Sequence, residues 1–198
     1  MRWRTADSMP RLELAANEVM IAAPAFWVED HPWLLHGSSV LLTVPFLMLF
    51  DRLSETSLFV GIQPLTLLLA IGLLIPFHEL FHGLAHPRAG FSSATVIGFD
   101  RRLACPYCLY TRPYSRARAI VVALAPFVVL TLLPLVAFVT WECCPLLAYF
   151  ATLNAGASAF DLACACYALA RLRDGQLIGV DAGKVVLVGN GNSMEVLP

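Results

Sequence analysis

The sequence predicts an all-α integral membrane protein with about four transmembrane helices and a short β-hairpin between the second and the third. Of the 198 residues, 59% are hydrophobic and only 14% are charged, and the mean hydropathy is +0.72. A soluble globule of this size would lack the polar side chains to cover its surface. Four long apolar segments, 34–50, 58–86, 118–140 and 146–170, reach or approach the roughly 20 residues that a helix needs to cross a bilayer.

The distribution of basic residues predicts the orientation in the membrane. If all four segments cross, every Lys and Arg except Arg52 lies on the side that holds both tails. The positive-inside rule then places both termini in the cytoplasm, and the expected location is the inner (cell) membrane. We interpret the chain as one membrane domain over 1–198, composed of an N-terminal tail (1–33), a transmembrane core (34–170) and a cytoplasmic tail (171–198).

Shorter patterns predict structure outside the spans. Residues 11–28 mix apolar and acidic side chains, which favours an interfacial helix. Residues 94–99 and 103–111 flank the polar turn at 100–102 and predict the β-hairpin, and 176–188 predict a second hairpin.

Several functional classes are disfavoured by composition. The net charge of −1 does not favour a nucleic-acid partner. Acidic residues in the first thirty positions argue against a cleaved signal peptide. The six cysteines form three close pairs, unlike a secreted disulfide scaffold, and we expect them to be mostly reduced. Cys105 and Cys108 have the spacing of a redox motif, and a redox or metal-binding role for this pair stays open.

The strongest chemical signal is His78-Glu79-Leu80-Phe81-His82 at the end of the second apolar segment. On a helix, His78 and His82 lie one turn apart on one face, so both imidazoles can bind one Zn²⁺. Zinc lowers the pKa of a bound water to about 7, and Glu79 is placed to act as the general base. Three ionisable groups inside an apolar span also need partners or water, which favours a functional site.

A catalytic zinc site usually takes three protein ligands, so a third must come from elsewhere. His86 continues the series, but on a straight helix it lies about 12 Å along the axis from His78, too far to share one ion. Asp161, the acid within the fourth segment, is the better candidate, because zinc would compensate its charge in the membrane. Asn154 lies on nearly the same helix face, where its amide can bind a substrate carbonyl or oxyanion, or another helix.

These residues resemble the membrane-embedded zincin peptidases, relatives of the site-2 protease group. The resemblance covers about residues 70–170 and includes the HExxH motif, the Arg-rich connection, Leu124-Ala125-Pro126 and the stretch from Asn154 to Asp161. It implies Zn²⁺ held by His78, His82 and Asp161, with Glu79 catalytic and Asn154 assisting. The chain lacks the Asp-Gly pair and the proline of typical site-2 proteases, since Leu162 follows Asp161.

The leading hypothesis is therefore a zinc metallopeptidase that cleaves a peptide bond near the cytoplasmic face. Its expected partners are membrane lipid and a membrane-protein or peptide substrate, and the oligomeric state is not assigned. One alternative is a non-catalytic metal-binding protein or inactive protease homologue, which closed metal coordination would favour. Another is a metal or solute transporter, although one carboxylate and two histidines give little room for a continuous polar pathway.

Overall fold

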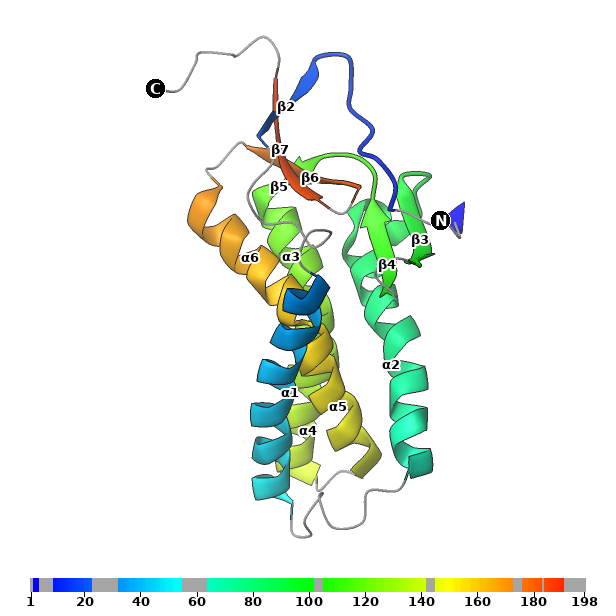
Figure 1. Ribbon diagram of the computed structural model, residues 1–198, viewed down its shortest axis with the longest axis vertical. Coiled ribbons are helices and arrows are strands. Elements are labelled where there is room, and N and C mark those ends of the chain that lie inside the picture. The colour runs from blue at the N-terminus through cyan, green and yellow to red at the C-terminus, as the bar shows by residue number, and fades with distance from the viewer. Residues whose placement is uncertain are drawn as a thin grey trace.

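The protein is a bundle of helices with two small β-sheets at one end (Figure 1). The computed structural model describes residues 2–3, 9–22, 32–54, 64–101, 105–141, 145–172, 176–182 and 184–190. Cys143 and Cys144, one of the three close pairs of cysteines in the sequence, lie outside these ranges.

Six α-helices and one π-helical segment build the described bundle. They are α1 (Pro32–Leu53), α2 (Pro64–Ala85), α3 (Arg116–Phe127), the π-helix η2 (Val128–Leu132), α4 (Leu133–Trp141), α5 (Pro145–Ala157) and α6 (Ala159–Arg171). The segment from α3 to α4 is one long helix interrupted by η2. Proline lacks the N–H that an α-helical ladder requires, and Pro126 and Pro134 flank this interruption.

Two of the described helices are long and apolar enough to cross a membrane: α2, and the continuous helix Arg116–Trp141. The bent pair α5–α6 makes a third candidate if it counts as one span. The first predicted segment forms α1, but among the described residues α1 is not one of the helices that are long and apolar enough to cross a membrane. The structure thus gives two or three candidate spans where the sequence predicted about four. Large apolar side chains on their outer faces, among them Leu65, Leu68 and Val139, are exposed, as lipid contact requires.

The fourth predicted segment is not one straight helix. It bends by 49° between α5 and α6, and Ser158 stands at the junction with φ −78° and ψ 1°. Gly156, just before the bend, allows α1 to approach, because a Cβ there would collide with the Thr43 side chain and the Ser39 carbonyl. The bend puts Asp161 in the first turn of α6.

The β-structure is more extensive than predicted, so the all-α description is incomplete. One sheet has the order β1-β3-β4, from β1 (Arg2–Trp3), β3 (Thr95–Asp100) and β4 (Cys105–Tyr110). The other has the order β2-β7-β6-β5, from β2 (Glu18–Ala22), β5 (Tyr114–Ser115), β6 (Leu177–Asp181) and β7 (Lys184–Asn190). Both predicted hairpins, β3–β4 and β6–β7, are confirmed as antiparallel pairs.

The predicted interfacial helix over 11–28 is wrong in its described part. Residues 18–22 form strand β2, which pairs antiparallel with β7. The run Val19-Met20-Ile21 contains two β-branched residues, which suit a strand, and its acidic neighbour Glu18 caps a local turn by accepting from the Ala15 N–H. Pairing with a strand 170 residues later in the sequence makes this segment a strand, and local composition does not reveal such a distant partner.

A buried cluster fixes the second sheet onto the bundle. Ala119 of α3, Ala168 of α6 and Ile178 and Val185 of β6 and β7 pack together with Leu172. A tight turn, the 3-10 helix η1 (Pro87–Gly90), sends the chain from α2 into the first sheet. Gly90 has φ +77°, and a Cβ there would stand 2.5 Å from the Gly83 carbonyl oxygen, so glycine is required. The sheets consequently lie against the motif end of α2.

Candidate metal centre

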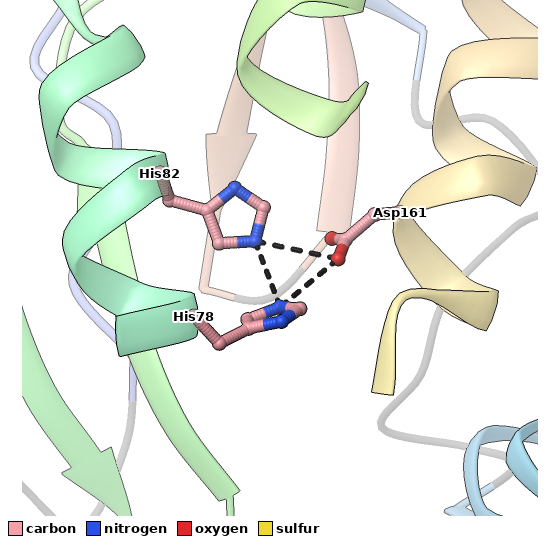
Figure 2. Close-up of side chains that lie close together, drawn as sticks. All are labelled: His78, His82 and Asp161. Atoms are coloured by element: carbon pink, nitrogen blue, oxygen red, sulfur yellow. Dashed lines mark hydrogen bonds and ion pairs between the residues drawn. The ribbon is translucent and has the colours of Figure 1, made fainter. Parts of the chain in front are cut away.

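His78 and His82 lie on one face of α2 and point toward Asp161 of α6 (Figure 2). Their Nε2 atoms are 3.2 Å apart. The Asp161 Oδ2 atom lies 3.2 Å from His78 Nε2 and 3.3 Å from His82 Nε2. Both imidazoles are buried, and the carboxylate is largely shielded. Three residues that the sequence singled out, from two different helices, therefore form one cluster.

The tautomer of His82 follows from its contact with α3. Its Nδ1 lies 2.9 Å from the Val122 carbonyl oxygen, which only accepts hydrogen bonds. Nδ1 must therefore carry the proton, and in the neutral ring Nε2 presents a lone pair to the cluster.

The tautomer of His78 is set by Asn154 of α5. The Asn154 Nδ2 donates to the Pro126 carbonyl at 3.0 Å and to Thr131 Oγ1 at 2.9 Å, which fixes the orientation of the amide. Its Oδ1 then faces His78 Nδ1 at 2.9 Å and accepts the proton of that nitrogen. His78 Nε2 is left with a lone pair, as in His82. The π-helical segment η2 supplies Thr131, which also donates to the Ala151 carbonyl at 3.1 Å.

The donor set fits a cation such as Zn²⁺. Two imidazole lone pairs and a carboxylate oxygen converge within 4.8 Å of one another, and the Asp161 Oδ2 has no hydrogen-bond partner although it is buried. Buried acceptors that face one another without a donor are costly unless a positive charge lies between them. Nitrogen and oxygen ligands from two His and one carboxylate match the three-ligand pattern of catalytic zinc sites.

A cavity of about 200 Å³ opens beside the cluster. Glu79 lines this cavity together with His78, His82 and Asp161. The Glu79 carboxylate lies near the backbone N–H of Cys108 in β4. Apolar side chains from α3, α6, β6 and β7 form most of the remaining wall, namely Val122, Ala123, Phe160, Ile178, Val180 and Val185. The cavity is large enough for water and for one side chain of a ligand.

His86 lines the same cavity but is not part of the cluster. Its ring lies against Tyr110, with a centroid distance of 5.6 Å. Burial lowers the pKa of His86 to about 4, so the ring is neutral at physiological pH. This position agrees with the expectation that His86 lies too far along the helix from His78 to share one ion.

The four described cysteines, Cys105, Cys108, Cys164 and Cys166, are free thiols. Burial raises the pKa of both Cys105 and Cys108 to about 12, so these thiols stay protonated. A protonated thiol is a poor metal ligand. Neither cysteine belongs to a described metal-binding group.

Asn154 occupies a different place from the one expected for a substrate-binding amide. Its amide hydrogen-bonds with His78, Pro126, Thr131 and Ser158, and the residue is fully buried. It is a positioning residue for His78. Sequence reasoning gave no role to Thr131 or to the carbonyl groups of Val122 and Pro126, because a backbone carbonyl carries no side-chain signal. The proline pair around η2 was the available hint of an irregular helix.

An apolar helical bundle with a His-His-carboxylate cluster beside a cavity has the ligand set of a zincin-type metal site. The chain belongs to the family described as putative zincin peptidase, whose model matches residues 71–174. That range includes all three residues of the cluster and Glu79 and Asn154. No curated protein matches the chain, and no solved structure does.

Proposed function

We propose that this protein is a membrane-embedded zinc metallopeptidase that hydrolyses a peptide bond near the cytoplasmic face of the membrane. The observation that carries the proposal is the convergence of the His78 and His82 Nε2 atoms with the Asp161 carboxylate, beside a cavity that Glu79 lines. The family to which the chain belongs supports peptidase chemistry.

Each residue of the site has a separate role in the proposed reaction. His78, His82 and Asp161 would hold Zn²⁺, which supplies a Lewis acid and brings the pKa of water down to about 7. Glu79, which lies near the Cys108 N–H, accepts a proton from water and passes it to the leaving amine. Asn154 and the Val122 carbonyl keep the imidazoles in the tautomer that binds metal. The apolar cavity wall holds the substrate and limits competing water.

The open cavity supports catalysis over a closed structural site. Structural zinc takes four protein ligands, whereas the described cluster has three and is bordered by free space. A non-catalytic homologue would need a fourth ligand, and the neighbouring His86 and Cys164 are not in the cluster.

We further propose that α1, α2, the helix Arg116–Trp141 and the pair α5–α6 all cross the inner membrane, with both termini in the cytoplasm. The basic residues of the connections support this orientation. Reporter fusions after residue 54 and after residue 141 should report the far side of the membrane, and a fusion after residue 101 the cytoplasmic side. A far-side signal at residue 101 would contradict the topology.

Substitution of Glu79 tests the chemistry most directly. The purified wild type should carry about one zinc per chain and cleave members of a pool of fluorogenic peptides. Glu79→Gln keeps the size of the side chain and should lower hydrolysis by roughly 10²–10⁴-fold with zinc content unchanged, because only the base is lost. Glu18→Gln on β2 is the matched control and should behave as wild type. Equal hydrolysis by Glu79→Gln and wild type would refute the assigned role.

A further inference from the structure

An extended N-terminal segment, Met9–Glu13, here called the strap, is tied to both sheets. The Ala182 N–H donates to the Pro10 carbonyl at 3.1 Å, and the Leu12 N–H donates to Asp181 Oδ1 at 2.9 Å, both at the end of β6. The Glu13 N–H donates to the carbonyl of Thr111, just after β4, at 2.6 Å. Figure 1 shows this part of the chain, in blue, at the sheet end of the molecule.

Among the described residues, the two sheets are not joined by strand pairing, and the strap hydrogen-bonds to both of them. The first sheet ends at β4 and the second at β5, and residues of β4, β5, β6 and β7 all line the cavity. Met9 belongs to the same lining, and the neighbouring Pro10 is buried. The strap thus places an apolar side chain of this protein at the cavity that holds the metal cluster.

The strap itself is not a strand of either sheet, although β1 before it and β2 after it pair with β3 and β7. The structure assigns no helix or strand to residues 9–15, and Arg11 and Glu13 are exposed. Leu12 of the strap lies so close to Gly179 of β6 that a Cβ on Gly179 would stand 2.5 Å from Leu12 Cδ1. The segment can therefore lift without breaking a ladder of β3–β4 or β6–β7, a property of regions that open locally.

We propose that the strap is a gate over the water-side mouth of the cavity and lifts to admit an extended peptide, one apolar side chain of which takes the place of Met9. The identity of the entering molecule rests on the proposed peptidase function. The opening itself does not, because the hydrogen bonds described above join the strap to Thr111, Asp181 and Ala182, which are outside the metal cluster.

Thiol labelling measures the opening without requiring metal or hydrolysis. Cys105 and Cys164 line the cavity, whereas Cys166 is exposed outside it. The full-length protein in lipid nanodiscs is treated with a charged methanethiosulfonate reagent, which enters from water, and each cysteine is quantified by peptide mass spectrometry. Leu12→Ala removes the contact with Gly179, and Gly179→Val displaces Leu12 from the opposite side while suiting a strand.

In both variants, labelling of the cavity thiols should rise roughly tenfold, as loss of one well-packed contact allows, while labelling of Cys166 stays constant. Arg11→Ala, an exposed position on the strap, is the matched control and should resemble wild type. Unchanged cavity labelling in whichever variant remains folded overturns the gate. Raised labelling without peptide hydrolysis in any variant would support the gate and count against the proposed peptidase instead.

Discussion

Two pairs of potential metal ligands in this chain have similar spacing and different outcomes. His78 and His82 are four residues apart on α2, and their Nε2 atoms lie 3.2 Å apart. Cys105 and Cys108 are three residues apart on β4, where successive side chains of an ideal strand alternate between faces. Both residues line the cavity, with Cys108 buried and Cys105 half-buried, and neither belongs to a described group of metal-binding side chains.

The difference shows that secondary structure decides whether two ligands at a given sequence spacing can reach the same metal ion. The helix brings its pair together and leaves two lone pairs facing Asp161. The strand does not bring its pair into a described group of metal-binding side chains, and the Cys108 backbone N–H lies near the Glu79 carboxylate. A metal or redox role for Cys105 and Cys108 stays a prediction, and the structure shows two free thiols outside the described metal-binding group.

The largest effect should come from the carboxylate of the helical cluster. Asp161→Asn keeps the shape of the side chain but removes the charge that compensates the metal. Zinc content should fall from about one per chain to less than about a tenth, measured by inductively coupled plasma mass spectrometry. The double variant Cys105→Ser/Cys108→Ser should keep its full zinc content, and its loss of zinc would reverse the comparison between the two pairs.

A smaller effect is expected at the residue that orients His78. Asn154→Leu leaves His78 Nδ1 and the Pro126 carbonyl without their partner. Zinc affinity should drop by about 10–100-fold, as for other residues that position a metal-bound histidine. Competition with a chromogenic chelator measures this change. Ser158→Ala, which removes only the 3.4 Å contact to Asn154, is the control and should bind zinc nearly as tightly as wild type.

The smallest effect concerns the thiols of the strand. Burial raises the pKa of Cys105 and Cys108 to about 12. The thiolate fraction of both should therefore grow about tenfold with each pH unit up to about pH 10.5. The iodoacetamide alkylation rates of the folded protein should follow this slope. A plateau near pH 9.5, as for a thiol of ordinary pKa near 8.5, would show that the two cysteines are in contact with water and able to bind metal.

The sequence predicted those parts of the site that depend on local periodicity. The helical spacing of His78 and His82, the turn residues of both hairpins and the isolation of Asp161 in an apolar segment were each sufficient for the correct expectation. Charge in an apolar surrounding is a strong signal, because an uncompensated carboxylate there is costly.

The missed features depend on contacts between distant segments. The bend at Ser158 reflects close packing of Gly156 on α1, and strand β2 depends on pairing with β7. The carbonyls of Val122 and Pro126 that complete the histidine network belong to the backbone, and the residue type at a position says little about where its carbonyl points. Such contacts become visible only when the helices are placed in space.

X-ray absorption at the zinc edge on purified wild-type protein tests the central claim most directly. The account predicts nitrogen and oxygen scatterers at about 2.0–2.2 Å, with the outer-shell pattern of two imidazoles and no sulfur. A zinc–sulfur distance of about 2.3 Å would place the metal on cysteine instead. That result, or protein that takes up no zinc at all, would contradict the assignment of His78, His82 and Asp161 as the metal centre.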